Sequence, residues 1–69
     1  MNKLTQNFPK QVRALRARLT LSQAEFAAKV AIAPSYVSML ERGQRTPTLD
    51  IIDQIAGKCG VDPQTLVRP

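Results

Sequence analysis

The fold is decided by the segment from residue 21 to residue 43, which reads LSQAEFAAKVAIAPSYVSMLERG. Ser22 and Glu25 have the spacing of a capping box, in which the serine hydroxyl and the glutamate carboxylate each pair with a free backbone N–H at the start of a helix. Pro34 suits the first turn of a second helix, because proline lacks the N–H that would be unpaired there. Gly43 is placed to end that helix, since glycine readily adopts the left-handed cap. The segment therefore predicts two short helices separated by a three-residue connection.

The sequence on both sides of this segment predicts further helices. An apolar stripe at helical spacing precedes it, on a helix that begins near Pro9: Phe8, Val12, Leu15 and Leu19. Another stripe follows it, on a helix capped by Thr48 and ended by Gly60: Leu49, Ile52, Ile55 and Ala56. Asp62 and Pro63 then open a final turn. No segment alternates as a strand does, so the sequence predicts an all-α fold of five short helices.

The composition excludes most catalytic and metal chemistry. The 69 residues include no histidine and one cysteine, so they provide neither a histidine acid–base group, nor a Cys/His zinc site, nor an internal disulfide. The chain also has no glycine-rich phosphate loop and no carboxylates paired at catalytic spacing. We therefore expect no enzymatic activity, no metal and no cofactor.

The length indicates a single domain, residues 1–69, in which we expect residues 8–67 to fold and residues 1–7 to be flexible. A lone thiol and the lack of a leader segment are typical of a protein of the reducing cytoplasm. No apolar run approaches the ~20 residues that a membrane-spanning helix needs. We expect a cytoplasmic protein with no membrane partner.

The formal charge of +5 is concentrated in the first two thirds of the chain. Residues 1–45 hold eight basic and two acidic side chains, whereas residues 46–69 hold two basic and three acidic ones. Such a basic segment favours a polyanionic partner, for which nucleic acid is the usual choice and an acidic membrane surface the competitor. Only the first predicted helix approaches the pattern of a membrane-surface helix, and its apolar stripe is better explained as core. A solvated basic face with no partner is the structural alternative.

Two short helices joined by a three-residue turn in a basic all-α domain are the ingredients of a helix-turn-helix. In that motif the second helix enters the major groove of DNA. The order and spacing of five segments resemble the Cro/phage-repressor type of helix-turn-helix domain, also named after the xenobiotic response element: residues 15–16, 21–27, 34–43, 45–49 and 59–61. The resemblance covers about residues 8–67. It implies a compact five-helix lambda-repressor-like domain, with the motif formed by helices 2 and 3, that binds double-stranded DNA.

The resemblance also implies roles for individual residues. Phosphate contacts are implied at the start of the second helix and in the loop after the third, at Ser22, Gln23, Arg42 and Arg45. Base-facing positions are implied on the third helix, at Pro34, Ser35, Ser38 and Met39. Tyr36 matches a position that meets the sugar–phosphate backbone, and Arg16 and Glu41 match a structural ion pair.

Each of these roles has a structural alternative. Gln23 could serve only as a helix former, and Ser35 could support the first turn of its helix. Tyr36 could pack on the first helix as a rim aromatic residue. Met39 could face either a thymine methyl or a protein partner, and the two arginines could lie in a solvated loop.

Two residues depart from the family pattern, and the base-facing set is thin. Ala31 stands where the family often has glycine, which costs up to about 1 kcal/mol if the backbone there is left-handed. Ala33 stands where a serine or threonine often caps the third helix, and its lack of a hydroxyl forfeits about 1 kcal/mol. The base-facing positions also include no arginine, asparagine or glutamine, so DNA shape and the loop arginines are expected to contribute more to recognition.

We expect the chain to be a transcriptional regulator, a repressor that binds an inverted-repeat operator as a homodimer, because one such domain reads few base pairs. The less charged C-terminal part is the expected contact surface between the two copies, with Ile51 and Val67 as candidate residues. An antitoxin-like or other protein-interaction module with secondary DNA binding is the alternative, in which a protein partner takes the place of the operator.

Overall fold

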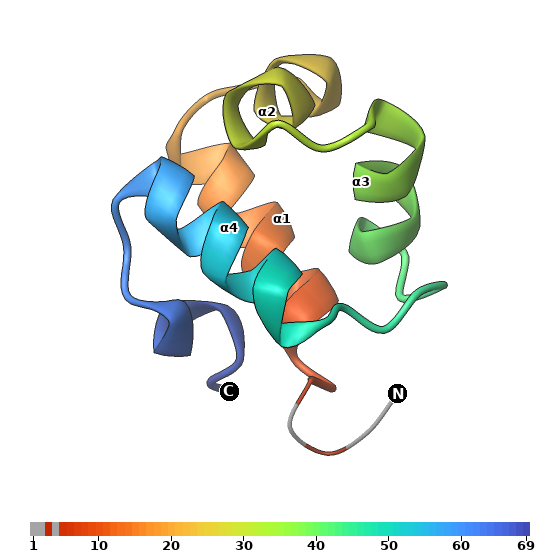
Figure 1. The fold of residues 1–69 in the computed structure, drawn as a ribbon, viewed down its shortest axis with the longest axis vertical. Helices are drawn as coiled ribbons and strands as arrows, with labels where there is room; N and C mark the ends of the chain where they lie inside the picture. Colours follow the sequence, from red (N-terminus) through yellow and green to blue (C-terminus); the bar gives the residue numbers. More distant parts are fainter. Residues whose placement is uncertain (1–2, 4) are drawn as a thin grey trace.

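Residue 3 and residues 5–69 are described by the structure, a computed structural model, and they form four α-helices and one 3-10 helix without a strand (Figure 1). The elements are α1 (Phe8–Arg18), α2 (Gln23–Val30), α3 (Pro34–Glu41), α4 (Leu49–Cys59) and η1 (Pro63–Leu66). The prediction of an all-α fold is confirmed. Four of the five predicted helices are α-helices. The last element, η1, has only four residues and forms a single 3-10 turn in place of the fifth helix.

The helices enclose one core. In this fold α1 packs against α3 and η1, α4 packs against α2 and η1, and α2 packs against α3. Figure 1 shows α4 in front of α1, with α3 at one side of the molecule. The side chains that are almost fully buried come from all five elements: Phe8, Val12, Leu15, Phe26, Ala27, Val30, Val37, Leu40, Ile52, Ile55, Ala56 and Leu66. Both predicted apolar stripes therefore supply the core, against which the half-buried Leu19 also packs, with one exception.

The exception is Leu49, which the sequence pattern placed on the buried side of its helix. Its side chain is 69% exposed, so that prediction is wrong. Leu49 is the first residue of α4. It lies three positions before the buried Ile52 and hence on the same face, but the core does not extend to the end of the helix.

The connection between α2 and α3 sets the orientation of α3 relative to the rest of the domain. Ala31 adopts the left-handed conformation (φ 61°, ψ 43°), and Ala33 caps α3 without a side-chain hydrogen bond. Gln54, on α4, donates from Nε2 to the backbone carbonyl oxygens of Val30 (2.8 Å) and Ala31 (3.2 Å). These bonds satisfy carbonyls that the end of α2 leaves unpaired and tie the turn to α4.

The start of α2 is fixed by the predicted capping box. The hydroxyl of Ser22 accepts from the Glu25 N–H at 3.1 Å, and the Glu25 carboxylate accepts from the Ser22 N–H at 2.8 Å. Hydrogen bonds with Ser22 hold the pKa of Glu25 below its ordinary value, and the bond from the Ser22 backbone N–H has the largest effect. The first backbone N–H groups of α2 remain without helical acceptors, as at any helix start.

Residues 1, 2 and 4 lie outside the described residues, so the flexibility expected of residues 1–7 stays a prediction. Thr5 is 3% exposed, and its carbonyl oxygen accepts a hydrogen bond from the Phe8 N–H at 3.1 Å. At the other end, Gln11 of α1 donates from Nε2 to the carbonyl oxygen of Arg68 at 2.8 Å. The last residues therefore pack back onto α1.

Candidate nucleic-acid interface

Helix α3 turns one face to the core and the other outward. Val37, Leu40 and Glu41 are buried, whereas Pro34 and Ser35 at the start of the helix are exposed. The remaining candidate residues of this helix are half-buried: Tyr36, Ser38 and Met39. We refer to the set Pro34, Ser35, Ser38 and Met39 as the outer edge of α3. No part of the chain that the structure describes covers this edge with a hydrogen bond or an ion pair from a side chain.

Glu41, the last residue of α3, is 3% exposed and accepts hydrogen bonds from two other elements. Arg16 donates to it twice, from Nε to Oε2 at 2.8 Å and from Nη2 to Oε1 at 3.0 Å. Gln23, the first residue of α2, donates from Nε2 to Oε1 at 3.1 Å. The hydrogen bond with Glu41 also raises the pKa of Arg16, against an opposing effect of burial. Every buried side-chain nitrogen or oxygen among the described residues has a partner.

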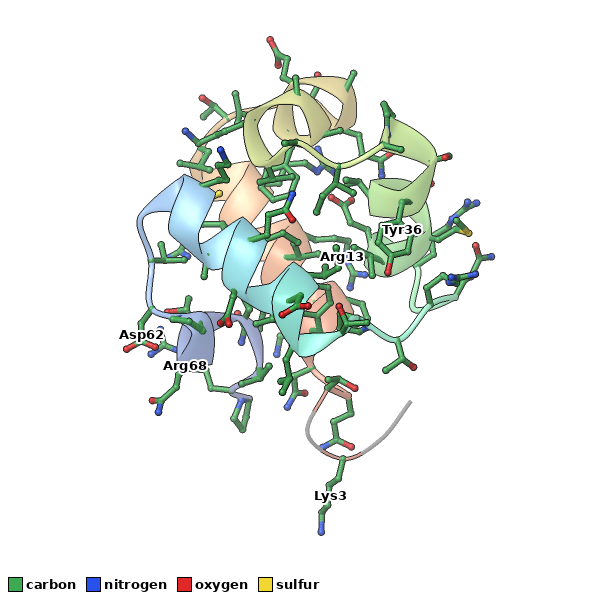
Figure 2. The ribbon with its side chains drawn as sticks, in the orientation of Figure 1. Lys3, Arg13, Tyr36, Asp62 and Arg68 are labelled. Atoms are coloured by element: carbon green, nitrogen blue, oxygen red, sulfur yellow. The ribbon has the colours of Figure 1, made fainter. Side chains whose placement is uncertain are left out.

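Two further contacts extend this cluster. Arg16 donates from Nη1 to the carbonyl oxygen of Leu21 at 3.1 Å, in the connection before α2. Arg13, one helical turn before Arg16, donates from Nη1 to the backbone carbonyl oxygen of Glu41 (Figure 2). Arg13, Arg16 and Gln23 with Glu41, hereafter the Glu41 cluster, therefore join α1 and the start of α2 to the end of α3.

The position of Gln23 bears on its expected phosphate contact. An amide nitrogen carries two N–H donors, and the bond to Glu41 uses one of them, which leaves the second available. Ser22 is exposed, and its hydroxyl accepts from Glu25 as the cap of α2. Both residues therefore lie at the N-terminus of α2, where unpaired N–H groups and the helix dipole favour an anion.

Arg42 follows directly on α3 and Arg45 lies in the loop beyond it, and both are exposed. Within the part of the chain that the structure describes, Arg16–Glu41 is the one ion pair, so neither of these two charges is compensated by a carboxylate. The guanidinium of Arg45 lies over the ring of Tyr36, with Cζ 5.7 Å from the ring centroid. The structure thus sets two uncompensated cations beside the outer edge of α3.

Sequence reasoning missed several contacts at this site. Arg13 is exposed, yet it donates to the backbone carbonyl oxygen of Glu41; the three-residue spacing that places it on one helix face with Arg16 could have indicated this contact. The bond from Gln23 to the Glu41 carboxylate was missed as well. The bond from Gln54 to the turn and the stacking of Arg45 on Tyr36 have no comparable local signal, because each joins segments whose proximity only the fold establishes.

The residues predicted for a contact between two copies lie in the C-terminal part of the chain, after α3. Ile51 and Val67 are half-buried and pack against the core. Leu49, which the sequence did not single out for this role, is the large hydrophobic side chain that the described surface exposes. A contact between two copies through these residues stays a prediction.

The described residues contain no pocket and no group of three or more side chains that could hold a metal ion. Among their helices, none has both the length and the apolar character needed to traverse a bilayer.

The fold and the arrangement of α2 and α3 define a helix-turn-helix domain. A family model described as "Helix-turn-helix" matches residues 12–66, which is most of the chain. The chain therefore belongs to this helix-turn-helix family, of the Cro and phage-repressor type, a class of DNA-binding regulators and not of enzymes.

Three relatives illustrate the membership. An uncharacterized HTH-type transcriptional regulator, y4dJ, of Sinorhizobium fredii is 38% identical over 80% of this chain and 71% of its own length. The control protein C.BamHI of Bacillus amyloliquefaciens is 34% identical over 87% of this chain and 75% of its own. The immunity repressor protein of Bacillus phage phi105 is 28% identical over 83% of this chain, but the match spans only 40% of that repressor. No solved structure matches the chain significantly.

Proposed function

We propose that the chain is a transcriptional repressor that binds a specific operator in double-stranded DNA. The observation that carries this proposal is the outer edge of α3, which lies open beside the uncompensated charges of Arg42 and Arg45. A helix of this size fits the major groove, and cations at its end attract the phosphates on the groove's rim. The names of the relatives, a transcriptional regulator, an immunity repressor and a control protein, support the same reading.

Each group at the interface has a distinct task in this mechanism. The N-terminus of α2 and the free amide N–H of Gln23 bind one phosphate, and Arg42 and Arg45 bind others, which sets the register of the domain on the duplex. The Glu41 cluster keeps these anchors in a fixed relation to α3. The outer edge of α3 then faces the bases, where Ser35 and Ser38 offer hydroxyls and Met39 offers an apolar contact to a thymine methyl.

This set of side chains reads few bases directly, because it lacks the bidentate groups that recognise guanine and adenine. Part of the sequence preference is therefore expected to come from the shape and deformability of the DNA. Binding by two copies extends the site further. Two molecules of 28 × 23 × 20 Å, placed side by side, can set equivalent helices about one DNA turn, ~34 Å, apart.

The proposed dimer uses the C-terminal side of the molecule. Leu49 exposes a large apolar side chain at the start of α4, and Ile51 and Val67 expose part of theirs. A homodimer that pairs this surface would bind an inverted-repeat operator and exclude polymerase from an overlapping promoter. The cytoplasm, as predicted from the sequence, remains the expected location.

A protein-interaction module, antitoxin-like in type, is the second candidate. The exposed Leu49 favours it, since an apolar side chain on the surface can serve a different protein as well as a second copy. In that case DNA binding would be secondary, and its dependence on salt would be weak.

Titration of random duplex DNA across a salt series distinguishes the two candidates. If the chain is a repressor, we expect the logarithm of its affinity for DNA to fall steeply with the logarithm of salt concentration, because phosphate contacts release counterions. A flat response would contradict it and favour the protein partner. In vitro selection of bound duplexes then gives the operator sequence and the spacing of its half-sites.

A further inference from the structure

The loop after α3 folds back along α3. Gly43 is left-handed (φ 74°), and the N–H groups of Gly43 and Gln44 donate to the carbonyl oxygens of Leu40 (3.2 Å) and Met39 (2.9 Å). These bonds reverse the chain direction at the end of α3. Pro47, farther along the loop, is buried. The loop is thus anchored at both ends, and Arg45 projects from its middle.

The return of the loop brings Arg45 to Tyr36, which lies nine positions earlier in the first turn of α3. Figure 2 shows the Tyr36 side chain lying along the outside of the helix. Its ring is half-buried and packs against the core, while the Arg45 guanidinium lies 5.7 Å from the ring centroid. This distance is within the range of a cation–π contact. The ring is therefore the half-buried partner of this contact, and the guanidinium is the exposed one.

The ring is the one partner that the described residues offer to the Arg45 side chain. No carboxylate forms an ion pair with it, and the structure shows no hydrogen bond from its guanidinium within those residues. A contact with an aromatic ring uses none of the five N–H donors of arginine. The contact with the ring therefore leaves the donors of Arg45 available for the oxygens of a phosphate.

We propose that Tyr36 is a positioning residue for Arg45, which holds the guanidinium beside α3 as a preformed phosphate contact before DNA arrives; this inference rests on the proposed DNA-binding function. Fixing a flexible arginine in advance lowers the ordering cost of binding. The ring performs this task, and the tyrosine hydroxyl is not required. The inference differs from the contact of Tyr36 with the sugar–phosphate backbone that the family resemblance implies, in which the hydroxyl is the binding group.

Four variants test the inference: Tyr36→Phe, Tyr36→Leu, Arg45→Ala and the double variant Tyr36→Leu/Arg45→Ala. Phenylalanine keeps the ring and lacks the hydroxyl, whereas leucine keeps apolar bulk against the core and lacks the π face. The dissociation constant for a selected duplex is measured for each across a salt series. Thermal unfolding of each variant without DNA provides the control for folding.

Tyr36→Phe is expected to bind as the unchanged protein does. Tyr36→Leu is expected to bind about threefold more weakly, the effect of an exposed cation–π contact, with the same salt slope because Arg45 still reaches its phosphate. In the Arg45→Ala background, Tyr36→Leu is expected to cause no additional loss. A merely structural role of Tyr36 would instead weaken both backgrounds equally.

A measurement without DNA completes the test. The ¹⁵N–¹H heteronuclear NOE of the Arg45 Nε–H group reports its mobility, and it is expected to be high in the unchanged protein and in Tyr36→Phe and lower in Tyr36→Leu. Equal losses of affinity in Tyr36→Phe and Tyr36→Leu would overturn the inference in favour of a hydroxyl–phosphate contact. If Arg45→Ala lowers the salt slope while Tyr36→Leu changes nothing, the inference alone fails; if the unchanged protein shows no salt-dependent binding, the proposed function fails.

Discussion

Two pairs of arginines lie around α3, and the protein uses them in opposite ways. Arg13 and Arg16 reach from α1 to Glu41, and together they hold the end of α3 on the domain. Arg42 and Arg45 lie beyond the end of α3, exposed and without a carboxylate partner among the described residues. The first pair fixes the position of α3 on the domain. The second pair provides positive charge beside α3 that attracts DNA phosphates. The Glu41 carboxylate compensates the charge of Arg16. Arg42 and Arg45 keep their charges toward DNA, and so does the exposed Arg13, whose bond goes to a backbone carbonyl.

Removal of Arg16 provides the strongest test of this division. Arg16→Ala leaves the carboxylate of Glu41, 3% exposed, with Gln23 as its remaining side-chain partner. Loss of one partner of a buried pair costs about 3–5 kcal/mol; since the Arg16 side chain is 26% exposed, we expect about 2–3 kcal/mol of the free energy of unfolding. Urea unfolding measures this loss.

Arg18→Ala is the matched control for Arg16→Ala. Arg18 lies in the last turn of the same helix and is exposed, so its removal should change the free energy of unfolding by less than about 0.5 kcal/mol. Equal losses in the two variants would show that the inward pair does not hold α3.

Removal of an outward arginine should affect DNA binding and not stability. Arg42→Ala and Arg45→Ala are each expected to lower the slope of log affinity against log salt by about one unit, because each phosphate contact releases about one counterion. The free energy of unfolding should stay within about 0.5 kcal/mol of its original value. Fluorescence titration and urea unfolding of the same preparations measure the two quantities. An unchanged slope in both variants would remove the distinction between the pairs.

A smaller gain is expected at the turn that sets the direction of α3. Ala31 is left-handed, and glycine adopts this conformation without the steric cost that alanine bears. We expect Ala31→Gly to raise the free energy of unfolding by about 0.5–1 kcal/mol. Ala28→Gly, at an exposed position inside α2, should lower it by about 1 kcal/mol. If urea unfolding shows a loss in both variants, the strain assigned to Ala31 is absent.

The smallest expected effect concerns pH. The pKa of Glu25 is lowered by its hydrogen bonds with Ser22, so the folded state binds this proton less readily than the unfolded chain does. The capping box is therefore fully stabilising above the unfolded pKa of Glu25, and this stabilisation is lost as pH falls through the lower folded pKa. Glu25→Gln should unfold at a lower temperature than the original protein near neutral pH, and the difference should disappear in acid. A difference that is constant with pH would contradict the role of the carboxylate.

The parts of the fold that local chemistry specifies could be predicted from the sequence. Ser22 and Glu25, Pro34 and Thr48 mark helix starts through their own hydrogen-bonding or backbone geometry, and the structure has helices beginning at these places. The final element was predicted as a helix and is a 3-10 turn, because four residues carry too little periodicity to separate the two. Leu49 follows the apolar spacing and is nevertheless exposed, since spacing does not tell where a neighbouring element stops.

The sequence could predict which residues lie at the candidate site, but not most of the contacts that these residues make. The family resemblance assigned Gln23, Arg42 and Arg45 to phosphates, but it did not indicate that Gln23 also donates to Glu41. The bond from Arg13 to Glu41 spans 28 positions in the sequence and that from Gln54 to Val30 spans 24. Such contacts depend on how the helices pack, and one sequence read alone does not reveal it.

Parallel in vitro selection with the unchanged protein and Ser38→Ala shows whether the outer edge of α3 enters the major groove. We expect the unchanged protein to select an inverted repeat and Ser38→Ala to relax the base preference at equivalent positions of the two half-sites, with an unchanged salt slope. Identical base preferences at every position for the two proteins, together with a lower affinity or an altered slope in Ser38→Ala, would instead place α3 on the DNA backbone.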